Sequence, residues 1–355
     1  MHATTVGVDL AKTRFEIAVA DQQFRIQRRE RLTRNQFCRF FANCPPSLIV
    51  MEACGSAHYW ARTLSSSGHE VQLLPPQYVR AYVRRNKTDA ADAAALIEAA
   101  RCAAIRCVPV KTVDQQLVQQ FHRLRTQWMT TRTARINYLR GCLREFGINF
   151  PLGAVRGLLA VREALRTGDN GFPDALRPWV LETLEEIAGL ERRIKAVEDQ
   201  LEDVLREDVV MWNLRRIPGI GLLSATALRV AVIDVHRFPT GRHLASWIGL
   251  TARECSSGER RRLGRISKRG DPYLRTLMIH GARAVLVSAQ RTAKAGLPRD
   301  RLRQWALQTQ ARCGHNKATV ALANKLARIV WATWYHDRRF DVNWSSSPKV
   351  TATAT

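Results

Sequence analysis

Four acidic residues near the start of the chain have the types and spacing of a metal cage. Asp9 ends a short β-prone run, Glu52 ends a second one, and Asp89 and Asp92 are three residues apart at the start of an alanine-rich stretch. Residues three apart on a helix share one face, and carboxylates held that close repel one another unless a cation lies between them. Carboxylate oxygens are hard ligands, suited to Mg²⁺ or Mn²⁺. Taken alone, the Asp-x-x-Asp pair would more simply be a capped, solvated helix start.

The elements expected around these acids bring them to one edge of a sheet. Strands are predicted over 4–9, 15–19, 24–27, 47–52 and 70–74, with a helix over 55–64 and another capped by Thr88 or Asp89. This order indicates a mixed sheet covered by helices, in which acids at strand ends meet at one edge. Two ions held there about 3.5–4 Å apart would activate a nucleophile and stabilise a leaving oxygen in phosphoryl transfer.

Composition points to a nucleic-acid partner. The 355 residues suffice for two or three domains, and 56 Lys and Arg against 31 Asp and Glu leave a net charge of +25. No apolar run approaches the roughly 18 residues of a membrane span, and no N-terminal signal segment is recognisable, so no membrane partner is expected. The eight cysteines have no paired Cys or Cys/His spacing, which predicts reduced thiols in a cytoplasmic, nucleoid-associated protein.

The middle of the chain has helical periodicity. A long helix is predicted over 114–146, with a basic face that is either solvated or in contact with a phosphate backbone. Residues 147–172 are rich in Gly and Pro and predict a loop-rich linker. A second long helix is expected over 173–205, because apolar residues recur from Ile187 to Val204 at alternating spacings of three and four. This short heptad stripe predicts pairing with the earlier helix, with another subunit, or with both.

Residues 214–228 resemble two helices joined by a Pro-Gly-x-Gly hairpin, with Pro218, Gly219 and Gly221 at the turn. In a helix-hairpin-helix element such glycines let backbone N–H groups approach phosphate oxygens, and the second helix presents its N-terminus to the anion. The simpler alternative is an ordinary tight turn between helices. Phosphate contacts of this kind position a nucleic acid without reading its sequence.

A strongly basic stretch follows around two serines, Ser256 and Ser257. Between Arg253 and Arg275 there are eight Lys or Arg residues, among them Arg260, Arg261, Arg262, Arg265, Lys268 and Arg269. Guanidinium groups would hold a scissile phosphate and stabilise its developing charge, while a serine needs activation before it can attack. By sequence chemistry alone, Ser-Ser-Gly is a turn and the arginines are a solvated patch.

Segments from both halves of the chain together resemble a known family. Residues 7–12, 51–55 and 86–92 look like those of the RuvC-like (ribonuclease H-type) D-E-D-D domain of one family of bacterial insertion-sequence transposases, and Leu250-Thr251, the Ser-Gly pair and 264–270 look like that family's C-terminal transposase domain. The resemblance implies that the serine before the glycine, Ser257, is the nucleophile, with Ser256 as the neighbouring alternative. It also implies a structured bridge RNA that pairs with donor and target DNA, and a composite site shared between the subunits of a dimer or tetramer.

The sequence therefore predicts a transposase that cuts and rejoins DNA. Its expected domains are an α/β RuvC-like domain over 1–110, a helical and coiled-coil arm over 111–210, a mainly α domain with the helix-hairpin-helix and the serine over 211–342, and a disordered tail over 343–355. The expected catalytic set is Asp9, Glu52, Asp89, Asp92 and Ser257, the four acids holding Mg²⁺ or Mn²⁺; Lys87, the 218–221 turn and the basic residues near Ser257 are expected to contact nucleic acid.

Two other interpretations remain open on the sequence. A RuvC-like junction resolvase would use a metal-activated water and leave Ser257 structural. A non-catalytic, basic nucleic-acid-binding protein would use its acids only as helix caps. Trp331, Trp334 and Tyr335 are predicted to belong to the core of the last helix rather than to stack on bases.

Overall fold

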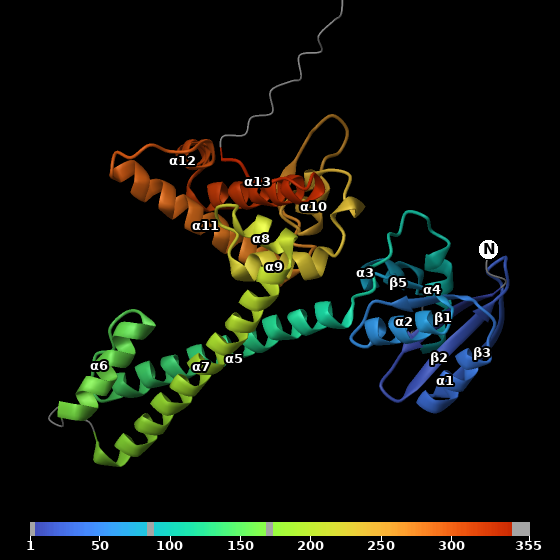
Figure 1. Ribbon diagram of the computed structural model, residues 1–355, viewed down its shortest axis with the longest axis horizontal. Coiled ribbons are helices and arrows are strands. Elements are labelled where there is room, and N and C mark those ends of the chain that lie inside the picture. Colours follow the sequence, from blue (N-terminus) through green and yellow to red (C-terminus); the bar gives the residue numbers. More distant parts are fainter. Residues whose placement is uncertain (1–3, 84–88, 168–172, 343–355) are drawn as a thin grey trace, which may run out of the picture. The chain divides into compact units, whose positions relative to one another are not determined.

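The computed structural model describes residues 4–83, 89–167 and 173–342, which fall into two compact units, Met1–Gln116 and Leu117–Thr355. Figure 1 shows the elements of each unit. Lys87, the expected cap at Thr88 and the tail from 343 lie outside the described residues. The domain boundaries at 110 and 210 stay predictions. No helix in the described ranges is long and apolar enough to cross a membrane.

The first unit is a mixed sheet covered by helices, as predicted. Its elements are β1 (Thr5–Leu10), β2 (Arg14–Ala20), β3 (Ile26–Thr33), α1 (Arg34–Ala42), β4 (Leu48–Glu52), α2 (Ala57–Ser66), β5 (Glu70–Leu74), α3 (Pro76–Val79), η1 (Arg80–Tyr82) and α4 (Asp89–Ala100). The strand order is β3-β2-β1-β4-β5. Strands β1, β4 and β5 are parallel to one another, and β2 is antiparallel to both of its neighbours, β1 and β3. This arrangement is consistent with a RuvC-like fold.

The third strand differs from the predicted one. It begins at Ile26 and continues to Thr33, whereas 24–27 was the expected range. Phe24 has a positive φ of 61° and lies in a turn, where the Asp21 carboxylate accepts hydrogen bonds from the backbone N–H groups of Gln23 and Arg25. The turn therefore ends before the strand begins, and β3 is longer than its apolar pattern suggested.

Each face of the sheet has its own core. On one face, Phe15 of β2 packs against Phe37 of α1 and Trp60 of α2, with ring centroids 4.6 and 5.3 Å away. On the other face, α4 packs its buried Leu96 and Ile97 against the strands. Because side chains alternate along a strand, odd and even positions of each strand belong to different cores.

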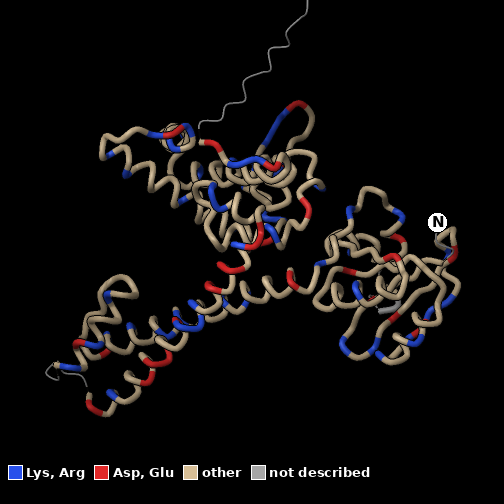
Figure 2. Tube along the Cα trace, in the orientation of Figure 1, with Lys and Arg blue, Asp and Glu red and all other residues tan. Residues whose placement is uncertain are grey.

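The arm is an antiparallel pair of long helices, α5 (Val113–Glu145) and α7 (Arg177–Glu207). Three ion pairs join them: Arg125 to Glu198 at 2.7 Å, Arg132 to Glu191 at 2.5 Å and Arg135 to Glu186 at 2.6 Å. Figure 2 shows basic residues along α5 and acidic residues along α7. Half of the predicted basic face of 114–146 is therefore neutralised within the chain, which leaves less of it for a phosphate backbone.

The heptad stripe of α7 is buried within this chain. Ile187 packs with Leu139 and Leu143 of α5, and Leu201 packs with Val118 of α5 near the other end of the arm. The predicted pairing of the two long helices is therefore confirmed. Pairing with another subunit stays a prediction.

The prediction of a loop-rich linker over 147–172 is wrong in part, because α6 (Ala154–Thr167) lies within it. Leu158 and Val161 of this helix pack into the core of the arm. Gly157 was taken as a helix breaker, but a Cβ there would lie 1.8 Å from the ring of Phe150. The glycine admits the aromatic ring, and burial of the helix outweighs its low propensity, about 1 kcal/mol.

The remaining elements form a helical body around the largest core. They are α8 (Val209–Arg215), α9 (Leu222–Val232), η3 (Val235–Arg237), α10 (Gly241–Trp247), the strands β6 (Ala252–Glu254) and β7 (Leu263–Ile266), α11 (Pro272–Lys294), α12 (Arg301–Cys313) and α13 (His315–Tyr335). Trp331 donates its indole N–H to the Phe238 carbonyl at 2.8 Å and stacks on Tyr335. Trp331, Trp334 and Tyr335 all pack against this core, as predicted.

A buried histidine joins the arm to this body. His122 of α5 lies 3.0 Å from the Thr226 hydroxyl of α9 and 2.9 Å from the Tyr273 hydroxyl of α11. Thr226 gives its own proton to the Leu222 carbonyl, so it accepts from His122 Nε2–H, and Nδ1 accepts from Tyr273. Burial, with a smaller contribution from the charge of Arg125, lowers the pKa of His122 to about 4.

This histidine predicts a specific loss of stability in acid. Unfolded His122 titrates near its ordinary pKa of 6.5, whereas the folded protein keeps it neutral down to about pH 4. Its contribution to the free energy of unfolding is therefore complete above pH 6.5 and is lost as the pH falls towards 4. The lost contribution is about 3 kcal/mol. Urea unfolding of the parent and of His122→Gln, followed between pH 7.5 and 4, should show a shallower pH dependence in the variant. His315→Gln, at an exposed histidine, is the matched control. If stability changes with pH equally in all three proteins, His122 is not the group responsible for the loss in acid.

Candidate active site

Asp9 and Glu52 stand on neighbouring parallel strands and on the same face of the sheet. The register between β1 and β4 pairs Val8 with Met51, and the two acids are the next residues along. Val8 and Met51 are buried against α1 and α2, so by alternation Asp9 and Glu52 belong to the face that α4 covers. The two strand-end acids thus lie where the sequence placed them.

Helix α4 comes unusually close to that face because β1 carries a glycine. A Cβ on Gly7 would lie 2.4 Å from the Ala93 carbonyl oxygen and 2.9 Å from Ile97. Only glycine admits the helix at this distance. Gly7 is two residues before Asp9, and Ala93 directly follows Asp92, so this contact brings the aspartate of α4 to the acidic edge of the sheet. The sequence analysis did not predict this close approach, although a glycine two residues before a strand-end acid could have signalled it.

Asp92 has an unsatisfied carboxylate oxygen. Its Oδ1 is buried and has no hydrogen-bond partner among the described residues. A buried carboxylate oxygen without a donor destabilises the fold unless a cation or a proton compensates it. The donor set of carboxylates and this unpaired oxygen fit a hard divalent ion.

The remaining members of the set are less fully described. Asp89 is the first residue of α4, but its side chain and all of Lys87 lie outside the described part. The Asp9 side chain or backbone already has an interaction partner within the protein, so Asp9 does not count as an unpaired acid. Among the described side chains, no three of His, Cys, Asp or Glu are close enough to hold a metal ion together. The four-carboxylate cage therefore stays a prediction that Asp9, Glu52 and Asp92 support by their placement.

The two serines lie on a hairpin that projects from the second unit (Figure 2), with a run of basic residues along its loop. Strands β6 and β7 form its stem, which the Cys255 N–H extends by donating to the Arg262 carbonyl at 2.9 Å. Ser257 and Arg260 bridge the tip, and Gly258 between them has a φ of +55°. The sequence predicted the turn but not the strands, because they are short and exposed.

The hydrogen bonds distinguish Ser256 from Ser257. Ser256 donates to the Glu254 carboxylate at 2.8 Å and accepts from the Arg262 N–H at 3.1 Å, so its hydroxyl holds the turn together. Ser257 is exposed, and within the described residues its hydroxyl has no partner. A free hydroxyl can approach a phosphorus atom, whereas one that bonds on both sides would first have to break the turn.

The base of the hairpin is a tight backbone crossing. A Cβ on Gly270 would lie 2.0 Å from the Trp247 carbonyl oxygen, and Gly249 has a φ of +82°. Arg275 donates from Nη1 to the carbonyls of Ile248 and Gly270 at 3.2 and 3.0 Å. Arg275 was counted among the eight cations near the serines, but it fastens the crossing instead of facing a ligand.

The other predicted cations of the hairpin are exposed. They are Arg260, Arg261, Arg262, Arg265, Lys268 and Arg269. Arg261 lies 3.5 Å from Glu254, a long and exposed pair that contributes little. Lys268 has a left-handed φ of 55°, which its N–H stabilises by donating to the Gly249 carbonyl at 3.2 Å. These side chains are available to an anionic partner.

The Pro218–Gly221 turn joins α8 and α9, and Gly219 is packed inside the body. A Cβ on Gly219 would lie 2.7 Å from the Gly281 carbonyl oxygen of α11, and one on Gly281 would lie 2.0 Å from the Gly219 oxygen. Pro218 is half-buried, while Gly221 is exposed and precedes the first turn of α9. The role of Gly219 in the fold is thus helix packing, and a contact with nucleic acid at this turn stays a prediction.

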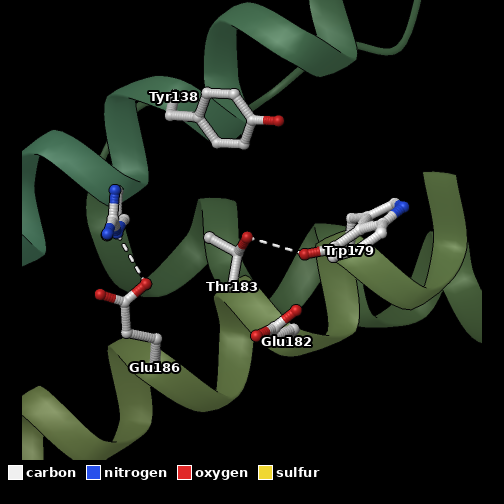
Figure 3. A pocket seen from close by; sticks show the side chains of 6 residues that line it. Tyr138, Trp179, Glu182, Thr183 and Glu186 are labelled. Atoms are coloured by element: carbon white, nitrogen blue, oxygen red, sulfur yellow. Dashed lines mark hydrogen bonds and ion pairs between the residues drawn. The ribbon is translucent and has the colours of Figure 1, made fainter.

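One hollow in the described surface lies on the arm, and none of these residues lines it. It measures about 380 Å³ and lies between α5 and α7. Figure 3 shows Tyr138, Trp179, Glu182 and Thr183 around it, with the Thr183 hydroxyl bonded to the Trp179 carbonyl and Glu186 paired with Arg135. It contains none of the predicted catalytic residues.

Comparisons with known proteins agree along most of the chain. A family model described as "Transposase IS116/IS110/IS902 family" matches residues 211–297, and a model of D-E-D-D transposases, described as "Transposase", matches residues 6–148. A "Probable family 20 transposase" of Pseudomonas aeruginosa is 43% identical over 94% of this chain and 97% of its own length. The transposase for insertion sequence element IS1111A of Coxiella burnetii is 38% identical over 92% of this chain and 88% of its own. The transposase for IS1328 of Yersinia enterocolitica is 33% identical, over 93% and 96%.

Proposed function

The chain belongs to the IS116/IS110/IS902 family of insertion-sequence transposases, enzymes that cut and rejoin DNA, and we propose that it does so with a D-E-D-D metal site and a serine nucleophile. Its D-E-D-D class depends on divalent metal ions. The observation that carries the proposal is the unpaired, buried Oδ1 of Asp92 on α4, the helix that covers the sheet face bearing Asp9 and Glu52. Asp89 completes the set from the same helix as Asp92.

In the proposed reaction, Ser257 Oγ attacks the scissile phosphorus. A new P–O bond forms to the serine, which gives up its hydroxyl proton to solvent, while the bond from phosphorus to the leaving DNA oxygen breaks and that oxygen takes up a proton from solvent, so the protons balance. The phosphoserine ester keeps the bond energy, so a hydroxyl of another strand can attack it and regenerate the serine. Mg²⁺, or Mn²⁺, bound by the acids would supply positive charge to the phosphate.

The basic residues of the hairpin hold the DNA in this proposal. Arg260–Arg262 and Arg265 lie on the loop and strand beside Ser257 and reach phosphate oxygens, with Lys268 and Arg269 nearer the base. At the 218–221 turn, the exposed Gly221 and the N-terminus of α9 offer backbone N–H groups to a phosphate. Lys87, two residues before Asp89 in the sequence, is proposed to contribute a further cation. A bridge RNA is the proposed guide, and a dimer or tetramer the proposed assembly.

Membership of a transposase family removes the interpretation as a non-catalytic binding protein. It leaves open the resolvase-like chemistry, in which a metal-activated water attacks the phosphate. Both mechanisms use Asp9, Glu52 and Asp92, but only the serine mechanism gives a covalent protein–DNA adduct. Incubation with labelled DNA and Mg²⁺, followed by denaturation and a search for that adduct, distinguishes them.

Neutralising the hairpin arginines is expected to flatten the salt dependence of DNA binding. Each lost phosphate contact removes about 0.7–0.9 from the slope of log K against log salt, so Arg260, Arg261 and Arg262→Gln together should reduce it by about 2 to 2.7. Equilibrium binding of the parent and variant over a range of salt concentrations measures this. The matched control replaces the exposed Arg192, Arg193 and Lys195 of α7 with Gln; if both triple variants show the same slope, the hairpin arginines are merely solvated.

A further inference from the structure

The row of side chains that contains Asp9 continues across the sheet to its open edge. The residue opposite Asp9 on β2 is Glu16, and the residue opposite Glu16 on β3 is Arg31. Directly opposite residues of antiparallel strands stand on the same face, about 4.5–5.5 Å apart at Cβ. A carboxylate and a guanidinium therefore lie beside the candidate catalytic edge, and neither belongs to the D-E-D-D set.

This face also carries two arginines that have no partner within the described residues. Arg14 is two residues before Glu16 on β2, and Arg29 lies opposite Ala18, whose neighbours are in α4. Both are exposed. Arg31 is held at 3.1 Å by Glu16, although its side chain is 59% exposed. The charge on this part of the face is thus three cations against one carboxylate.

The opposite face of β3 is organised differently. Arg28 lies over the Phe40 ring of α1 at 5.2 Å and pairs with Glu30 at 2.8 Å, so both belong to the face that α1 covers. Because side chains alternate along a strand, the arginines of β3 lie on two different faces. Arg28 packs against α1, while Arg29 and Arg31 lie on the face that carries Asp9.

The spacing suits a nucleic-acid backbone. Arg29 and Arg31 are two residues apart on an extended strand, about 6.6 Å, which is close to the rise of two nucleotides along the DNA helix axis, about 3.4 Å each. Strand β3 is the last in the sheet order, so no other strand of the described ranges pairs with its outer side. A phosphate chain can run along this edge towards Asp9 without displacing any element of the sheet.

We propose that Arg14, Arg29 and Arg31 form a binding strip for the DNA phosphate backbone, and that Glu16 holds Arg31 until DNA replaces it as the partner. The strip is defined by these three arginines and lies on the face of β2 and β3 that is continuous with Asp9. The inference rests on the proposed function for the identity of the bound strand as DNA. The arginine strip would hold in place the DNA strand that leads to the phosphate being cut.

The test measures binding of the full chain to a labelled DNA duplex in the presence of EDTA, so that no cleavage occurs. Arg29→Gln and Arg31→Gln should each weaken binding about five- to tenfold at 0.15 M salt and reduce the salt slope by about 0.7–0.9. Arg14→Gln should act in the same direction. Glu16→Gln should tighten binding about two- to fivefold, because it releases Arg31 and removes a negative charge.

The controls are Arg28→Gln and Glu30→Gln, which make the same charge changes on β3 but on the opposite face of the sheet. Since they alter the net charge identically, only local contact separates them from the strip variants. Equal effects on the two faces, or a weakening by Glu16→Gln, would overturn the proposal. Thermal unfolding of each variant checks the fold, and Arg31→Lys, which keeps the charge, should retain most of the affinity.

The outcomes also separate this inference from the proposed function. If the strip variants bind DNA like the parent while Asp92→Asn loses cleavage, the strip is wrong and the catalytic site remains. If Asp92→Asn still cleaves while the strip variants bind weakly, the metal site is wrong and the strip remains. Weakened binding to a labelled RNA hairpin with unchanged binding to DNA would assign the strip to RNA and contradict the proposal.

Discussion

Replacing Asp92 with asparagine is expected to abolish strand cleavage without unfolding the protein. The amide keeps the shape of the carboxylate but loses the charge and one strong metal ligand, and catalysis should fall at least about a thousandfold. Stability should be unchanged or slightly higher, because the buried Oδ1 has no donor among the described residues and an amide is cheaper to bury than an unpaired carboxylate. Asp9→Asn should lose cleavage to a similar extent.

Cleavage of labelled DNA, Mn²⁺ binding by electron paramagnetic resonance and thermal unfolding together measure this effect. The matched control is Glu98→Gln on the same helix, an exposed acid that pairs with Arg101. The control should cleave and bind Mn²⁺ like the parent, whereas Asp92→Asn should bind the ion weakly. An Asp92→Asn protein with near-normal recombination would exclude Asp92 from the metal site.

Replacing Ser257 with alanine is expected to remove the covalent DNA adduct and strand exchange together. The variant lacks the attacking oxygen but keeps the carboxylates and the arginines of the hairpin, so DNA binding should persist. Because the Ser257 hydroxyl makes no hydrogen bond among the described residues, its loss should leave the hairpin unchanged. The reaction should fall to the background of the assay, since the neighbouring Ser256 hydroxyl is bonded within the turn on both sides.

Ser256→Ala is the adjacent control and should behave differently. It removes the bonds to Glu254 and to the Arg262 N–H, so it loosens the turn and should reduce activity without eliminating the adduct. Trapping the adduct with denaturant, digesting it and mapping the modified peptide by mass spectrometry identifies the nucleophile. A nucleotide on Ser256 would move the role by one residue. Full cleavage by Ser257→Ala, with no adduct in the parent protein, would assign the attack to a metal-bound water.

The nuclease-like unit was largely predictable because its signals are local. The β-prone run of 4–9 and the continuous apolar run of 47–52 identify strands, and each ends in an acid. The chain returns parallel from β1 to β4, so Asp9 and Glu52 come together without any further information. The heptad stripe of α7 is equally local, and it correctly predicted the pairing with α5.

The prediction failed where a distant partner decides the role of a residue. Gly157 lies in a stretch whose composition is typical of a linker. It nevertheless belongs to α6, because the Phe150 ring fills the space that a Cβ would take. Arg275 belongs to a basic run in the sequence, but two backbone carbonyls at the hairpin base fix it in place. In both cases a tertiary contact outweighs the local preference.

By itself, then, the sequence determined the acids at the strand ends, the mixed sheet, the two long helices and the serine turn, because periodicity and turn chemistry are encoded within a few residues. Only the tertiary structure decided which charges remain available. Arg132 and Glu191 are 59 positions apart and meet on the arm, whereas Arg29 has no described partner on the catalytic face. Ion pairing depends on distance in space, and the register of packed helices and strands sets that distance.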